Sequence, residues 1–192
     1  MKVHSFVRNS APQVIYATGS SPLNYQNFFN FFYFLFAPTL IYRDHYPLTK
    51  NINWIFAFQR FLECLSVLLM FTFILDAVYP TPERWLQKFT ISETILLIVQ
   101  TMPYGALILM GAFLLVFHSL QNFFAEITRF GDRLFYMDWW NASNFNIWLT
   151  KWNMLVQDWL YYYIYRDFKI YVCDSTFLAR LVVLLISFFV HE

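Results

Sequence analysis

The sequence of 192 residues has few charged residues and only two cysteines. Charged residues make up 13%, against about 25% in an average soluble protein. The net charge of +1 is too small, and the basic residues are too dispersed, to attract nucleic acid. Cys64 and Cys173 fit neither a disulfide framework nor a zinc site. We therefore expect two buried free thiols and no metal site.

Apolar and aromatic residues are abundant instead. They make up 59% and 23% of the chain, and the mean hydropathy is +0.44. This composition is typical of a membrane protein. The first residues, MKVHSFVRNSAP, lack the apolar core of a signal peptide, so insertion is expected to depend on internal spans. We predict an all-α fold, a polytopic bundle of membrane helices with amphipathic helices at the interface.

Two apolar stretches predict membrane-spanning helices. Residues 94–117 carry no formal charge. At about 1.5 Å per residue they are long enough to cross a hydrocarbon core of about 30 Å. Pro103 lies in their middle and predicts a kink, which neighbouring helices can tolerate. Residues 54–79 are predicted to form the second span.

The basic residues predict the topology. Residues 1–53 and 118–175 hold most of the lysines and arginines, so we expect both segments on the cytosolic side and residues 80–93 on the opposite side. Within the span at 54–79, Arg60 and Glu63 are three residues apart and are expected to pair on one helix face. We interpret them as an interfacial ion pair that fixes the depth of the helix, rather than as a site.

Two aromatic segments lie outside these spans. Residues 27–42 are short and end near Pro38, so we expect them to lie in the interface or to enter the membrane partway. Residues 145–172 carry an aromatic stripe at spacings typical of one helix face. The stripe consists of Trp148, Trp152, Trp159 and Tyr163. Packing against other helices, anchoring at the membrane surface and lining a ligand tunnel all stay open as its role.

Residues 177–192 are predicted to begin a third span with an ionisable residue deep inside it. From Leu181 to Val190 the helix rises about 15 Å, so we expect His191 near the middle of a bilayer about 30 Å thick. An ionisable residue at that depth is a functional candidate. Because a chain end at Glu192 would leave charged groups in hydrocarbon, we expect the chain to be a fragment or a truncated product.

Four segments carry family-specific motifs: FAPTLIYRDHYPLT (36–49), FHSLQNFFAEITRFGDRLFYMDWWN (117–141), KWNMLVQDWLYYYIYRDF (151–168) and ISFFVHE (186–192). Together they resemble the sterol O-acyltransferases of the membrane-bound O-acyltransferase (MBOAT) superfamily. The FYxDWWN motif, with VHE ending a later apolar helix, is shared with diacylglycerol O-acyltransferases. APTLIYRD and DWLYYY favour the sterol branch. The resemblance covers nearly all of this chain but only the central part of a typical family member.

The resemblance implies a partial MBOAT-like bundle in the endoplasmic reticulum membrane. Such an enzyme joins the acyl group of a long-chain acyl-CoA to a sterol hydroxyl and releases CoA. It needs no cofactor, because acyl-CoA is a co-substrate, and its other implied partners are membrane lipid and further copies of the complete chain. Diacylglycerol as the acceptor, or a noncatalytic truncated subunit, are the alternatives.

The resemblance also implies His191 and Asn153 as catalytic residues. A neutral imidazole can take the proton of an attacking hydroxyl. An amide donor can stabilise the charge that develops on the thioester oxygen. Ser187 lies one turn before His191, where it is expected to orient the imidazole, meet the substrate or bond to its own backbone.

The FYMDWWN segment is expected beside the acyl-CoA tunnel, where aromatic faces line the passage and polar side chains bind CoA or the backbone. From the residues alone, interfacial anchoring is the alternative. The candidate acyl-CoA-binding residues are Phe135, Tyr136, Asp138, Trp139, Trp140, Asn141, Tyr165, Lys169 and Ser187. The basic candidates for the CoA phosphates are Arg133, Lys151, Arg166 and Lys169.

A second polar pattern, H-x-x-x-N-x-x-x-E, is found in the same family. His118, Asn122 and Glu126 share one helix face if the helix continues, and we expect secondary polar contacts there. One position departs from the family. Gln157 replaces the usual histidine before DW, and it can donate a hydrogen bond but cannot exchange protons. His45 is expected in an exposed loop.

Overall fold

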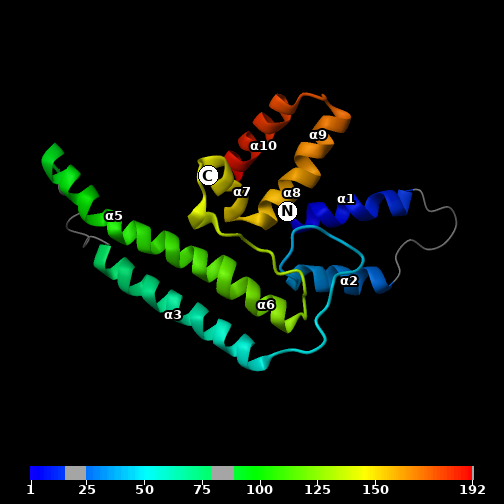
Figure 1. Cartoon of the computed structure of the whole chain (residues 1–192), viewed down its shortest axis with the longest axis horizontal. Coiled ribbons are helices and arrows are strands. Elements are labelled where there is room, and N and C mark those ends of the chain that lie inside the picture. The colour runs from blue at the N-terminus through cyan, green and yellow to red at the C-terminus, as the bar shows by residue number, and fades with distance from the viewer. Residues whose placement is uncertain (16–24, 79–88, 192) are drawn as a thin grey trace. The chain divides into compact units, whose positions relative to one another are not determined.

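The computed structural model describes residues 1–15, 25–78 and 89–191. Within these ranges the chain forms helices and connecting segments, and the only β-type pairing is an isolated bridge between Leu48 and Phe130 (Figure 1). The all-α prediction is therefore confirmed. The chain divides into a hairpin unit, Asn51–Ile127, and a split unit formed by Met1–Lys50 and Thr128–Glu192.

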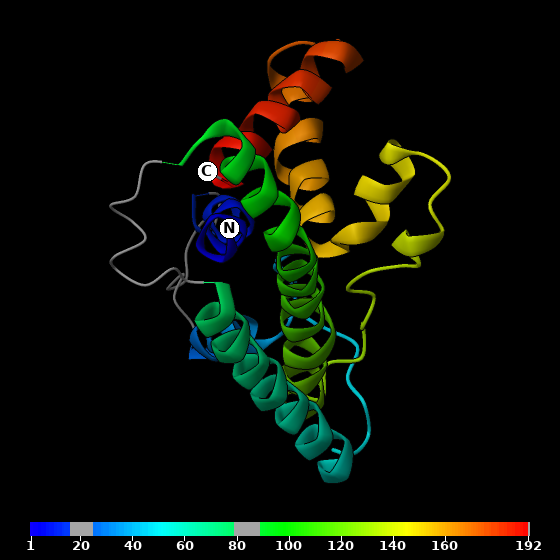
Figure 2. The same cartoon turned by 90° about the vertical axis from the view of Figure 1, so that its left-hand side faces the viewer.

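The hairpin unit consists of two long helices that run side by side (Figures 1 and 2). The first is α3 (Trp54–Val78). The second is continuous and comprises α5 (Ile91–Phe113), the π-helical η1 (Leu114–Leu120) and α6 (Gln121–Ile127). In the described part of the chain these are the two helices long and apolar enough to cross a membrane. Their large apolar side chains are mostly exposed, as in helices that face lipid.

The second helix extends beyond the predicted residues at both ends. It begins with a capping box, in which Thr90 Oγ1 accepts from Glu93 N at 3.4 Å and Glu93 Oε2 accepts from Thr90 N at 2.8 Å. This T-x-x-E pattern is visible in the sequence. The helix then passes through Pro103, bends along its length (Figures 1 and 2) and reaches Ile127.

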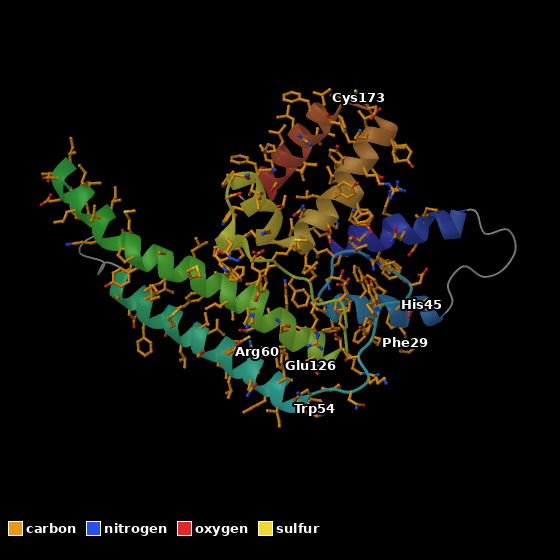
Figure 3. All side chains as sticks on the ribbon, in the orientation of Figure 1. Phe29, His45, Trp54, Arg60, Glu126 and Cys173 are labelled. Carbon is orange, nitrogen blue, oxygen red and sulfur yellow. The ribbon has the colours of Figure 1, made fainter. Side chains whose placement is uncertain are left out.

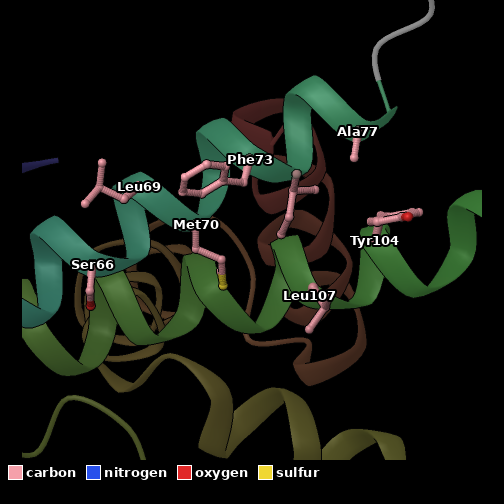
Figure 4. Close-up of a pocket in the computed structure, with 8 residues that line it drawn as sticks. Ser66, Leu69, Met70, Phe73, Ala77, Tyr104 and Leu107 are labelled. Carbon is pink, nitrogen blue, oxygen red and sulfur yellow. The ribbon is translucent and has the colours of Figure 1, made fainter.

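A glycine lets the two long helices approach closely. A Cβ atom on Gly111 would lie 2.5 Å from Met70 Cε and 2.7 Å from Phe71 Cε1. The absence of a side chain at this position therefore permits the contact between α3 and α5. The same helix pair also forms an open groove of about 550 Å³, and Met70 is one of the residues that line it (Figure 4). Its lining is almost entirely apolar and includes Leu69, Phe73 and Leu107.

The split unit contains the remaining described helices. They are α1 (Lys2–Ile15), α2 (Tyr25–Phe36), the 3₁₀ turn η2 (Trp139–Asn141), α7 (Phe145–Trp152), α8 (Met154–Leu160), the π-helical η3 (Tyr161–Tyr165), α9 (Arg166–Tyr171) and α10 (Thr176–His191). The elements α8, η3 and α9 follow one another without a break, and α10 packs against η3 and α9.

The core of the split unit lies where α1 meets α8 and η3. Trp159 and Tyr163 are buried there with Leu160. Trp159 Nε1 donates to Ser5 Oγ at 3.0 Å, and Ser5 Oγ donates to the carbonyl oxygen of Leu40 at 2.6 Å. Since Ser5 has no exposed surface, these hydrogen bonds also satisfy a polar group that burial would otherwise penalise.

A lysine caps the C-terminal end of α2. Lys2 Nζ donates to the carbonyl oxygens of Phe34 at 2.6 Å, Leu35 at 2.8 Å and Ala37 at 2.6 Å. The last carbonyl groups of a helix have no intrahelical partner, and the ammonium group satisfies them. Burial lowers the pKa of Lys2 to about 8. As predicted, α2 ends just before Pro38.

The predicted aromatic stripe does not lie on one helix. The backbone of Asn153 (φ −142°, ψ 88°) separates α7 from α8. Trp159 and Tyr163 are core residues, whereas Trp148 and Trp152 stack on each other with ring centroids 5.0 Å apart. The spacing predicted one face, but the break gives the two halves of the stripe different neighbours.

The prediction of two buried cysteines is half right. Both are free thiols, and Cys64 is buried in α3, but Cys173 is exposed beyond the end of α9 (Figure 3). Cys173 lies in the short connection between α9 and α10, where no other described element packs on its side chain. His45 is exposed, as predicted (Figure 3).

Candidate functional site

The backbone of the FYMDWWN segment is attached to the segment that joins α7 and α8. Met137 N donates to Lys151 O at 2.9 Å, and Met154 N donates to Phe135 O at 3.0 Å. The Phe135 side chain is 1% exposed and belongs to the core. Two motifs that are separate in the sequence therefore form one local structure around Asn153.

The two charged residues of this structure pair with each other. Lys151 Nζ lies 2.7 Å from Asp138 Oδ1, and this hydrogen bond holds the pKa of Asp138 below its usual value. The backbone turns directly afterwards, where Asn141 N donates to Asp138 O at 3.1 Å. Asp138 therefore connects the two segments and remains partly accessible to solvent.

Aromatic rings of η2 and α7 pack against one another in this local structure. Trp139 meets Trp152 edge-on with centroids 4.7 Å apart, and Phe145 stacks on Trp148 at 5.6 Å. Trp140 is exposed. Together with the stacked pair Trp148 and Trp152, these rings of η2 and α7 form an aromatic layer.

Asn153 caps α8. Its Oδ1 accepts from Val156 N at 3.1 Å, and the side chain is half-buried. An N-cap asparagine uses its oxygen for the helix, so its Nδ2 amide is the part that can donate to a ligand. Asn144 caps α7 in the same way, with Oδ1 accepting from Ile147 N at 2.9 Å.

The predicted residues of the α8, η3 and α9 helix lie along its length. Tyr165 stacks on Tyr161 with centroids 5.6 Å apart. Lys169 Nζ is 2.9 Å from Asp174 Oδ1, and this hydrogen bond raises the pKa of Lys169. In the described part of the chain, the buried Oε1 of Gln157 has no hydrogen-bond partner.

The backbone of α10 carries Ser187 and, one turn later, His191. The His191 side chain and Glu192 lie outside the described residues. Ser187 is half-buried and has an interaction within the structure. The sequence-based roles of His191 and Ser187 therefore stay predictions.

The H-x-x-x-N-x-x-x-E pattern lies in the hairpin unit on the helix that runs beside α3 (Figure 3). His118 Nε2 contacts Arg60 Nη1, and Asn122 Nδ2 donates to His118 O at 2.7 Å. Glu126 Oε1 accepts from Asn53 N at 2.6 Å, directly before the start of α3. His118 and Glu126 thus connect the two long helices.

The predicted pairing of Arg60 with Glu63 is confirmed, with 2.8 Å between Arg60 Nη2 and Glu63 Oε1. Sequence reasoning did not predict their contacts with the second helix, since these depend on how the helices pack. It also missed the residues through which α1 contacts the later helices of the split unit, among them Ser5 and Arg8. Arg8 Nε lies 3.1 Å from Asp167 Oδ2. Lys2, Ser5 and Arg8 recur every third residue, and that spacing could have revealed them.

Comparison with known proteins places this sequence in a family. A family model for membrane-bound O-acyltransferases matches residues 7–192. Sterol O-acyltransferase 1 of Mus musculus is 38% identical over 200 residues, sterol O-acyltransferase 2 of Mus musculus 37% over 197, and sterol O-acyltransferase 2 of Homo sapiens 36% over 197.

Each alignment covers 100% of this chain, and the chain spans 36% of the first relative and 37% of the other two. The chain thus corresponds to slightly more than a third of these relatives. Since the family model matches nearly every residue, from position 7 to position 192, the chain belongs to the membrane-bound O-acyltransferase family.

Proposed function

We propose that the protein that contains these residues transfers the acyl group of a long-chain acyl-CoA to a sterol hydroxyl, giving a sterol ester and free CoA. The observation that carries this proposal is the identity of 36–38% with sterol O-acyltransferases over the whole chain. The quoted motifs, FYMDWWN and VHE among them, support the same reaction.

In the proposed reaction, His191 is the base. The sterol oxygen attacks the thioester carbonyl while the imidazole takes the hydroxyl proton. The C–S bond then breaks, and the departing sulfur receives that proton, so CoA leaves as a thiol. Asn153 would stabilise the intermediate, because Nδ2 can donate to the oxyanion while Oδ1 stays in the α8 cap.

Acyl-CoA is proposed to lie along the aromatic layer formed by FYMDWWN and α7. Tyr136, Trp139, Trp140, Asn141 and Tyr165 are the proposed contacts, and Ser187 is placed near the reacting end. Phe135 is buried and would support the segment from beneath. Lys169 is available to the CoA phosphates, because its partner Asp174 is 85% exposed and a solvated ion pair costs little to exchange.

The proposed setting is the endoplasmic reticulum membrane, with α3 and the apolar part of the Ile91–Ile127 helix as spans and α10 as part of a third. The motif region, residues 118–175, would face the cytosol, where acyl-CoA is supplied. The complete protein is proposed to form homo-oligomers and to contact membrane lipid.

The test is ester formation by membranes that hold the full protein, given radiolabelled oleoyl-CoA with cholesterol or with diacylglycerol. His191→Ala should lower the rate about 10² to 10⁴-fold, since it removes the base. His45→Ala alters an exposed loop histidine and should leave the rate unchanged. Substantial ester formation by His191→Ala would refute the base, and esterification of diacylglycerol alone would refute the sterol acceptor.

A second arm uses residues 1–192 alone. We expect no ester from them, because a reaction tunnel that excludes water needs more helices than this segment supplies. Ester formation by the segment would contradict that expectation and leave the assignment of His191 to be decided by the first arm.

A further inference from the structure

A polar cluster lies between the two long helices of the hairpin unit. Arg60 and Glu63 come from α3, and His118 and Ser119 come from the π-helical η1. Arg60 Nη2 lies 2.8 Å from Glu63 Oε1, Ser119 Oγ donates to Glu63 Oε2 at 2.8 Å, and Arg60 Nη1 contacts His118 Nε2. The proposed acyl transfer assigns no step to these four residues.

The hydrogen-bonding capacity of the groups decides where the histidine proton lies. A guanidinium has only donors, so a ring nitrogen that it contacts must accept. His118 Nε2 therefore carries no proton, and in a neutral imidazole the proton is then on Nδ1. A doubly protonated ring would place two cations in contact.

Burial and charge make this cluster specific. The Arg60 side chain is 16% exposed and lies over the Phe56 ring, with 5.1 Å between the guanidinium carbon and the ring centroid. Glu63 neutralises it, and Ser119, which is 2% exposed, occupies the second carboxylate oxygen. Within an apolar helix pair, ionised groups are stable only when paired in this way.

The π-helical turn brings two consecutive residues into the cluster. His118 reaches Arg60, and its neighbour Ser119 reaches Glu63. The Asn122 side chain donates to the His118 carbonyl oxygen at 2.7 Å and supports the backbone of this turn. Local π-helical turns are found frequently at functional sites.

We propose that Arg60, oriented by Glu63, is a positioning residue that holds His118 as the neutral tautomer protonated on Nδ1. His118 then acts as a hydrogen-bond donor through Nδ1 and cannot act as a base through Nε2. This inference does not depend on the proposed acyl transfer, although it leaves His191 as the base in that reaction.

The test is solid-state NMR of the full protein in lipid bilayers at neutral pH, with histidine labelled with ¹⁵N and ¹³C. His118→Asn assigns the His118 signals by difference. We expect a neutral ring with a protonated Nδ1 and a non-protonated Nε2. The ring state is read from the unmodified cluster, and the His118→Asn variant serves only to assign the signals.

The second measurement removes the proposed cause. Arg60→Met combined with Glu63→Gln deletes both charges together, so no unpaired charge stays in the helix pair. We expect loss of the Nδ1-protonated signal of His118. The control is Arg43→Met, which removes an exposed arginine of the split unit and should leave the spectrum unchanged.

Each outcome decides the proposal. An Nδ1-protonated ring that disappears in the double variant supports it. A His118 ring protonated on Nε2, or on both nitrogens, in the unmodified cluster would overturn it. An Nδ1-protonated ring that persists in the folded double variant would overturn the role of Arg60. None of these results depends on whether ester formation is observed.

Discussion

At the scale of single residues, Asn153 combines two tasks that a substitution can separate. Aspartate caps a helix as well as asparagine does but has no amide donor. Asn153→Asp should therefore keep the α8 cap and lose ester formation about 10²–10³-fold. Asn153→Ala should lose both, with a stability cost of about 0.5–2 kcal/mol. The measurements are ester formation in membranes and thermal unfolding of the purified protein.

Asn144 provides the matched control, because it caps α7 through the same kind of hydrogen bond. Asn144→Ala should cost a similar stability without a comparable loss of rate, and Asn144→Asp should change neither property much. Full activity of Asn153→Asp would show that the amide is not needed.

The Asp138 and Lys151 pair predicts a pH dependence. The lysine lowers the pKa of Asp138, so the pair stabilises the fold above the usual aspartate range and loses its effect as pH falls through the lowered pKa. Because Asp138 is half exposed, the contribution is small and weakens with salt. Lys151→Met should raise the pKa of Asp138, as measured by ¹³C NMR of labelled aspartate. An unchanged titration would contradict the pairing.

At the scale of helices, the contact between α3 and α5 is tested at Gly111, with Gly105 of the same helix as the control. Gly111→Ala places a methyl group against Met70 and Phe71 and should destabilise the protein by about 1–3 kcal/mol. At Gly105 no atom lies within 4 Å of the added methyl. Gly105→Ala should therefore stabilise the helix by about 0.4–1 kcal/mol. Unfolding in bicelles measures both, and equal effects would contradict the packing.

The helices differ in how well the sequence predicts them. Uncharged apolar runs predict the two long helices. The second helix extends to Ile127, however, and its last turns contain polar residues, so the apolar pattern does not predict where it ends. The break at Asn153 could not be predicted from spacing, because asparagine fits a helix interior poorly but is not excluded from it. The i, i+3 spacing predicted the Arg60 and Glu63 pair, whereas their contact with His118 depends on helix packing.

The candidate site was predicted mainly through its motifs. FYMDWWN and KWN are separate in sequence, and only the fold shows that their backbones bond to each other around Asn153. Local signals predict such capping residues well. They do not predict which partner a lysine chooses: Lys151 and Lys169 both pair with aspartates, and each pair must be exchanged before the lysine can bind a phosphate.

At the scale of the whole molecule, the topology is tested at Asn141-Ala142-Ser143, the single glycosylation sequon of the chain. We predict that Asn141 stays unmodified in microsomes, because positive-inside counting puts residues 118–175 on the cytosolic side. Synthesis with microsomes should give the same gel mobility for the native sequence and for Asn141→Gln, with a secreted glycoprotein as the control. A glycan on Asn141 would reverse the topology.

The two parts of the split unit meet through the backbone. Thr49 N donates to Arg129 O and Gly131 N donates to Pro47 O, both at 2.8 Å, around the bridge of Leu48 with Phe130. Thr49 and Arg129 are 80 positions apart. At about 5–20 residues per second, a ribosome needs about 4–16 s to make the residues between them. The first part of the unit must therefore wait for its second part until the whole hairpin has been synthesised.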